Sequence, residues 1–133
     1  MRNLDIFNCA ALEIMNASLE KFPLVTSIDP KIIAEAVTEY FDKQSLEDLT
    51  ERELFMTCYS TIKWLEQERF LIIKQGLQSG ECSVILTQKG LNALNAIPSF
   101  ADSQKKSFGE YFTDGVKSVP FSVVSGLMSD FFK

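Results

Sequence analysis

Histidine is absent from this sequence of 133 residues. Its absence removes the commonest general base, the serine–histidine and cysteine–histidine nucleophile pairs, and every zinc site that needs an imidazole ligand. Cysteine is scarce as well, because Cys9, Cys58 and Cys82 are too few for an all-cysteine zinc site and each lies among apolar neighbours. We therefore predict a non-enzymatic protein without metal or cofactor, whose three thiols are reduced and buried.

The sequence also lacks a long apolar run and a glycine-rich phosphate loop. No stretch of about 18 uninterrupted apolar residues occurs, and the first residues lack the apolar segment of a signal peptide. The six glycines stand apart from one another. A content of 46% hydrophobic and 23% charged residues suits one modest globular core. We expect a soluble, cytoplasmic protein.

Apolar residues with helical spacing predict two helices near the start of the chain. Asp5 can cap the first helix, which is broadly apolar and ends before Phe22-Pro23. The segment 24–26 is β-prone. Asp29-Pro30 then provides a cap and a proline at the first helical position for a second helix, whose apolar pattern continues to Phe41.

A third helix, a hairpin and a fourth helix are predicted between Thr50 and Pro98. Thr50 and Glu53 form a capping box, after which four apolar residues define a narrow core stripe: Leu54, Cys58, Ile62 and Leu65. The runs 71–74 and 83–86 flank a polar, glycine-containing loop and predict a β-hairpin. Thr87 can cap a short helix that Pro98 ends.

Two stretches of sequence resemble the winged helix-turn-helix family. Residues 64–71, WLEQERFL, look like the end of a recognition helix that runs into the wing, with Arg69 where glycine is usual. Residues 86–94, LTQKGLNAL, are similar to the leucine-threonine-x-lysine-glycine-x-x-x-leucine sequence that closes the wing in many bacterial winged-helix regulators. The resemblance covers about residues 5–98 and implies a three-helix core, a two-stranded wing and a closing helix.

The fold class that we expect is therefore α+β and mostly helical. We expect a winged-helix domain over residues 1–98, a linker over 99–107 and an amphipathic helical tail over 108–133. The resemblance further implies that helix 51–69 enters a DNA major groove while the hairpin 72–87 touches the backbone or minor groove. The candidate face for DNA or a partner comprises Arg52, Met56, Tyr59, Ser60, Lys63 and Lys74.

Charge weakens the expectation that this face binds DNA. Residues 1–97 carry nine lysines and arginines against fourteen aspartates and glutamates, and the wing tip 75–81 has no basic residue. Four acidic residues crowd the start of the third helix: Glu47, Asp48, Glu51 and Glu53. We therefore place protein–protein interaction or self-association ahead of DNA-binding transcription regulation. Met56, Tyr59, Trp64 and Leu77 are the candidate anchors, although a core position is the better expectation for Trp64.

The tail carries an apolar stripe that needs burial. Ser107 and Glu110 form a capping box, and Pro120 interrupts the stripe, so we expect two short helices or one kinked helix. Packing onto the preceding domain and homo-oligomerisation are comparable expectations, whereas the tail's four lysines and four acidic residues make membrane binding the weakest. Six residues form the candidate tail interface: Phe108, Phe112, Val116, Val123, Leu127 and Phe131.

Overall fold

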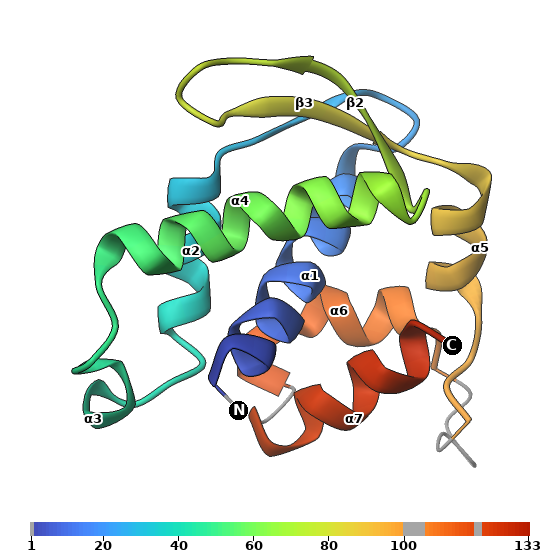
Figure 1. Cartoon of the computed structure of the whole chain (residues 1–133). Coiled ribbons are helices and arrows are strands. Elements are labelled where there is room, and N and C mark those ends of the chain that lie inside the picture. The colour runs from blue at the N-terminus through green and yellow to red at the C-terminus, as the bar shows by residue number, and fades with distance from the viewer. Residues whose placement is uncertain (1, 100–105, 119–120) are drawn as a thin grey trace.

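A computed structural model of the chain describes residues 2–99, 106–118 and 121–133, with the side chains of all of these except residues 2, 114–118, 121 and 122. Its elements follow one another in this order: α1 (Arg2–Lys21), β1 (Thr26–Ile28), α2 (Pro30–Thr38), α3 (Lys43–Leu46), α4 (Glu51–Gln67), β2 (Leu71–Gly76), β3 (Cys82–Leu86), α5 (Gln88–Asn95), α6 (Phe108–Ser118) and α7 (Phe121–Phe131). The fold is α+β and mostly helical, as expected, with one small sheet on one side of the helices (Figure 1).

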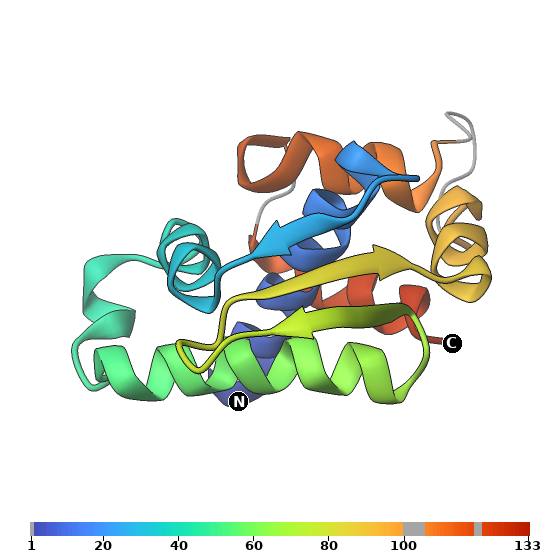
Figure 2. The same cartoon turned by 90° about the horizontal axis from the view of Figure 1, so that it is seen from above.

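The sheet contains the predicted hairpin and one strand more. Strands β2 and β3 pair antiparallel, with Leu71 opposite Leu86, and β1 pairs antiparallel with the other edge of β3. The order is thus β1-β3-β2, as Figure 2 shows. The expectation of a two-stranded wing was incomplete, because β1 has only three residues and its partner lies far along the sequence. A periodicity of two cannot be recognised in so short a strand.

The helix caps were predicted better than the helix ends. Asp29, Thr50 and Thr87 each cap a helix through a side-chain oxygen that accepts a backbone N–H, as predicted. Asp5 is not a cap, because α1 already begins at Arg2 and Asp5 lies in its first turn. Helix α2 ends at Thr38, before the end of its apolar pattern, and the short α3 occupies a segment for which no helix was predicted.

Helix α1 is the centre of the core. It packs against α2, α4, α6 and α7 as well as the sheet, and Figure 1 shows it crossing between them. A helix that is surrounded in this way has apolar residues on all sides rather than along one stripe. Six of its side chains have no exposed surface: Cys9, Ala10, Ala11, Leu12, Ile14 and Met15.

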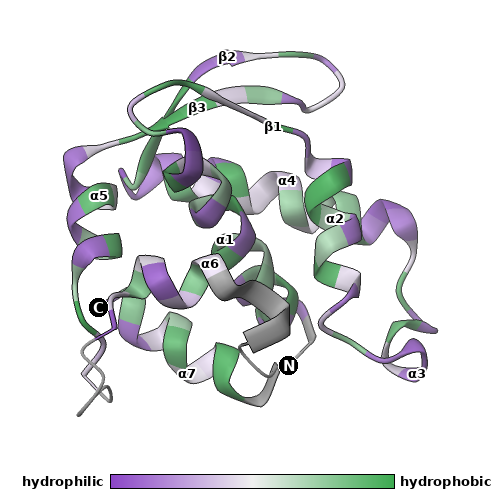
Figure 3. Ribbon diagram, turned by 180° about the vertical axis from the view of Figure 1, so that it is seen from behind, coloured by the Kyte–Doolittle hydropathy of each residue, from purple (hydrophilic) through white to green (hydrophobic). Residues whose placement is uncertain are grey.

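The tail forms two helices that pack against α1 of the same chain (Figures 1 and 3). The predicted capping box is confirmed, since the Glu110 N–H donates to Ser107 Oγ at 3.2 Å and the Ser107 N–H donates to Glu110 Oε1 at 3.1 Å. Four residues of the candidate tail interface are buried in the core: Phe108, Phe112, Leu127 and Phe131. Val123 is 43% exposed, and the Val116 side chain lies outside the described residues. Self-association of the chain stays a prediction, with these four side chains buried within the chain.

Candidate functional site

Helix α4 is held with one side in the core and the other toward solvent. The predicted stripe is confirmed, because Leu54, Cys58, Ile62 and Leu65 are all buried. At the other side, Arg52, Ser60 and Lys63 are exposed and Met56 is 44% exposed. Tyr59 is half-buried, and Lys74 is exposed on β2. The candidate residues are therefore at least partly accessible, and those on α4 extend over about three turns of the helix.

The hairpin turn lies against this face of α4. Gly80 has a φ of +96°, and a Cβ built there would come within 3.1 Å of the Phe55 ring and 3.4 Å of the Tyr59 ring. The Phe55 and Tyr59 rings are parallel, with centroids 6.5 Å apart, and Lys63 Nζ lies 5.8 Å from the Tyr59 centroid. The sequence analysis missed Phe55, although its spacing of four from Tyr59 marks a pair on one side of a helix.

The C-terminal end of α4 closes with a Schellman motif. Arg69 has a φ of +68°, the Phe70 N–H donates to the Leu65 carbonyl at 2.9 Å and the Arg69 N–H donates to the Glu66 carbonyl at 2.9 Å. The left-handed backbone at this position explains why glycine would be favourable there, since a side chain in that conformation costs about 1 kcal/mol. Arg69 adopts this conformation at the point where the chain turns from α4 into β2.

Hydrogen bonds and a close backbone approach hold the start of α5 against the end of α4. Thr87 Oγ1 donates to the Arg69 carbonyl, and Lys89 Nζ donates to the Glu68 carbonyl at 2.8 Å. A Cβ at Gly90 would lie 2.0 Å from the Phe70 carbonyl oxygen, so only glycine allows this approach. The threonine, lysine and glycine of the 86–94 sequence thus have distinct structural roles, and together they fix the end of α4.

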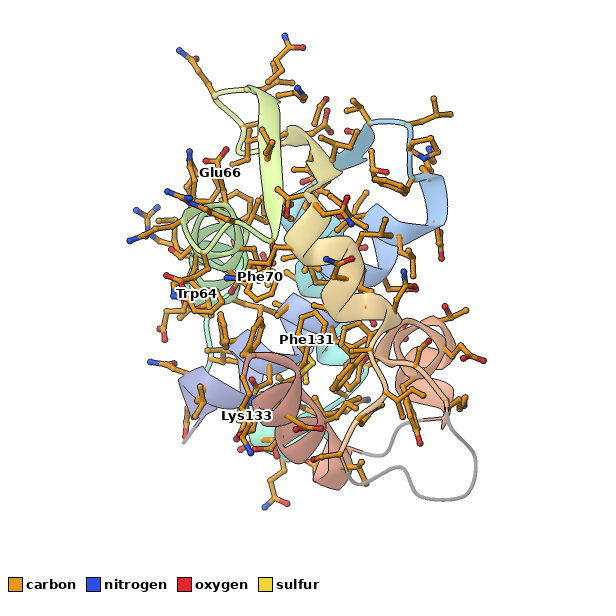
Figure 4. The ribbon with its side chains drawn as sticks, turned by 90° about the vertical axis from the view of Figure 1, so that its right-hand side faces the viewer. Trp64, Glu66, Phe70, Phe131 and Lys133 are labelled. Atoms are coloured by element: carbon orange, nitrogen blue, oxygen red, sulfur yellow. The ribbon has the colours of Figure 1, made fainter. Side chains whose placement is uncertain are left out.

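Aromatic rings connect this end of α4 to the tail. Trp64 packs edge-on against Phe7, with ring centroids 5.1 Å apart, and against Phe132 at 5.2 Å. Phe70 lies 6.4 Å from Trp64 and 5.6 Å from Phe131, so the three rings form a row between α4 and α7 (Figure 4). Trp64 is only partly buried, and it combines contacts to the core with exposed surface.

Trp64 separates two hollows in the surface. The first, which we call the α1–α4 groove, has a volume of about 360 Å³ and is lined by Asn3, Phe7, Met56, Thr57, Ser60, Thr61 and Trp64. None of these described lining residues carries a charge. The second, which we call the α5–α7 pocket, has a volume of about 550 Å³ and also contains the rings of Phe70, Phe108, Phe131 and Phe132.

The buried titratable groups lie away from both hollows and are poorly suited to catalysis. Burial raises the pKa of the Cys9 and Cys58 thiols to about 12, and it also raises the pKa of Cys82. The three thiols are free and buried, as predicted. The Tyr40 hydroxyl donates to Glu13 Oε2 at 2.7 Å, and burial is the main reason that the pKa of Glu13 is raised. This pair connects α1 to the turn that follows α2 and lines neither hollow.

Over the described part of the chain, no group of three or more cysteine, aspartate or glutamate side chains is arranged to hold a metal ion. None of the helices in the same residues combines the length and the apolar character needed to cross a membrane. In comparisons with known proteins, the chain matched no family model, no curated protein and no solved structure. The geometry of α4 and the two hollows is therefore the basis of a functional proposal.

Proposed function

We propose that the protein is a non-catalytic winged helix-turn-helix protein that binds a protein partner through the outer side of α4 and the α1–α4 groove. The order of the elements supports the fold assignment: α4 occupies the position of the recognition helix, and β2 and β3 that of the wing. The absence of histidine and the burial of the thiols support a binding role rather than a catalytic one.

The composition of the groove is the observation that carries this proposal. Phe7, Met56 and Trp64 offer apolar and aromatic surface, and Ser60 and Thr61 offer hydroxyl groups. Aromatic and methionine side chains with few charges are typical of the central part of protein interfaces. A DNA-binding face, in contrast, places lysines and arginines where the phosphates lie. The groove is therefore better suited to an apolar side chain than to a nucleic acid.

Exposed acidic residues outnumber Arg52 around the start of α4, and this excess favours a partner with basic residues. Glu53 lies one turn before Thr57 on α4, and Glu51 is exposed at the first position of the same helix. Asp48 and Glu47 are also exposed just before this helix. An apolar segment flanked by lysines or arginines would complement this surface. A second copy of the chain, whose net charge is −5, would bring like charges together.

DNA-binding transcription regulation remains the second candidate because a few cations are accessible on the same face. Arg52 and Lys63 are exposed on α4, and Lys74 is exposed at the base of the hairpin. In this alternative, Tyr59, Ser60 and Lys63 would contact bases while Arg52 and Lys74 contact phosphates.

Selection from a displayed library of random peptides tests the first candidate. We expect enrichment of peptides with an apolar residue flanked by basic residues, and we expect Ser60→Phe, which fills the groove, to abolish their binding. Ser125→Phe is the matched control, because Ser125 is an exposed helical serine on α7 that does not line the groove. Enrichment of acidic peptides, or binding that survives Ser60→Phe, would contradict the proposal.

Fluorescence anisotropy with mixed duplex DNA over a series of salt concentrations tests the second candidate. Binding that falls steeply with salt and weakens with Lys63→Ala would favour the DNA-binding alternative. The protein-binding proposal predicts that the protein does not bind the DNA even at low ionic strength.

A further inference from the structure

The two aromatic walls of the α1–α4 groove come from different helices. Phe7 lies on α1 and Trp64 on α4, and their rings meet edge to face with centroids 5.1 Å apart. Both side chains are only partly buried. A partly exposed side chain keeps one orientation only where its neighbours restrict it. The shape of the groove therefore depends on what supports these two rings from within the protein.

Phe132, the residue that follows α7, contacts both rings. Its ring centroid lies 5.7 Å from that of Phe7 and 5.2 Å from that of Trp64, so the three rings form a closed triangle. Phe132 is not among the described residues that line the groove, and it lines the neighbouring α5–α7 pocket instead. The Phe132 ring thus supports the two groove rings without offering surface to a partner in the groove.

The core of the protein holds Phe132 itself in place. Its N–H donates to the Met128 carbonyl at 3.1 Å, which continues the hydrogen-bond pattern of α7 by one residue. Its ring centroid lies 5.4 Å from that of Phe70 and 5.2 Å from that of Phe131, and both of these residues are 5% exposed (Figure 4). The packing of the tail on the rest of the chain therefore determines where the Phe132 ring lies.

We propose that Phe132 is a positioning residue for partner binding, because it holds Phe7 and Trp64 in the arrangement that forms the groove. This inference rests on the proposed function of the groove. Without the Phe132 ring, Phe7 keeps a ring contact to Trp64 alone among the described side chains. A partner would then have to order the groove rings itself, at an entropic cost that a preformed site avoids.

Titration with a selected basic, apolar peptide that contains no tryptophan measures the effect on binding. Phe132→Ala should weaken binding about tenfold under conditions in which circular dichroism shows the variant to be folded. Phe132→Tyr keeps the ring and should restore the affinity. If Phe132→Ala does not fold, Phe132→Leu, which keeps apolar volume without a ring, takes its place.

Leu127→Ala is the matched control for a loss of stability. Leu127 is a buried residue of α7 that is 1% exposed and lines neither hollow. Its truncation should lower the unfolding temperature at least as much as Phe132→Ala does, because it leaves a cavity in the core. The folded Leu127→Ala variant should nevertheless bind the peptide with unchanged affinity.

The fluorescence of Trp64 tests the positioning without any peptide. Trp64 is the single tryptophan of the chain, so the emission excited selectively from tryptophan reports the surroundings of this ring. Phe132→Ala should shift the emission to longer wavelength and increase its quenching by acrylamide, because the truncation exposes one side of the indole. Phe132→Tyr and Leu127→Ala should leave both properties unchanged.

Four results would overturn the inference, and they are distinguishable from one another. Unchanged Trp64 emission in Phe132→Ala would show that Phe132 does not position this ring. Equal peptide affinities of Phe132→Ala and the unsubstituted protein would show that the positioning does not matter for binding. A loss of affinity that Phe132→Tyr does not restore, or that Leu127→Ala shares, would exclude a specific role of the ring. A selection that yields no binding peptide would overturn the proposed function of the groove, and the role of Phe132 in partner binding with it.

Discussion

The tail and the outer side of α4 are both rich in apolar residues, but the fold treats them differently. In the tail, Phe112, Leu127 and Met128 are at most 1% exposed, because α6 and α7 pack onto α1. On α4, Met56 remains 44% exposed beside the half-buried Tyr59 and Trp64. An apolar stripe in a sequence thus indicates that the stripe needs burial. Only the structure shows which stripes are buried within the chain and which remain exposed.

Phe112→Ala breaks this comparison most strongly. Because Phe112 has no exposed surface, its truncation should lower the free energy of unfolding by about 3–5 kcal/mol. Met56→Ala, on the outer side of α4, should change it by less than about 0.5 kcal/mol. Urea unfolding followed by circular dichroism measures both. Equal effects of the two substitutions would mean that the tail is not part of the core.

Gly90→Ala tests whether the close approach of α5 to Phe70 fixes the C-terminal end of α4. A Cβ at this position would overlap the Phe70 carbonyl, so we expect a loss of about 1–3 kcal/mol in the free energy of unfolding. Gly126→Ala is the control within the tail, where a Cβ meets nothing within 4 Å, and it should stabilise the protein by about 0.5–1 kcal/mol. Similar effects at both glycines would mean that the contact between α5 and the end of α4 does not stabilise the protein.

The pKa of Cys58 tests whether the inner side of α4 is shielded from water, in contrast to the exposed outer side. Burial raises the pKa of this thiol from 9.0 to about 12, so the folded state retains a proton that the unfolded state loses. The stabilising contribution is complete below pH 9 and declines between pH 9 and 12, by about 1.4 kcal/mol per pH unit. Cys58→Ala should therefore show a flatter decline in stability over this range. An unchanged pH dependence in equilibrium unfolding would show that the thiol is not shielded from water.

Apart from the control variants, Arg69→Gly is expected to have the smallest effect. Glycine adopts the left-handed backbone without a steric cost, so the free energy of unfolding should rise by about 1 kcal/mol. Gln67→Gly, two residues earlier in the last turn of α4, should lower it by about the same amount. Thermal unfolding of the two variants compares these opposite signs. A destabilised Arg69→Gly variant would mean that the arginine side chain makes a compensating contact.

Sequence reasoning worked where the signals are local. The caps at Asp29, Thr50 and Thr87, the core stripe of α4 and the β2–β3 hairpin all depend on residues within a few positions of one another. The sequence analysis did not include strand β1 in the sheet, because this strand is defined by its pairing with the distant β3. The end of α2 at Thr38 was missed because Tyr40 and Phe41 continue an apolar spacing outside the helix.

The candidate site could be predicted only in part for the same reason. The exposed residues of α4 follow from a helical wheel once the core stripe is recognised. The groove, however, needs Asn3 and Phe7 from α1 beside Trp64, and the pocket needs α7 beside α5. Contacts of this kind join segments far apart in the chain, and no local pattern specifies them.

Hydrogen exchange of the protein with and without a selected basic, apolar peptide tests the central claim most directly. We predict that the peptide slows exchange at the start of α1 and along residues 56–64 of α4, while the amides of α7 are protected to the same extent in both states. A peptide that instead changes the exchange of α6 and α7, and leaves α4 unaffected, would contradict the proposal that the outer side of α4 is the partner-binding surface.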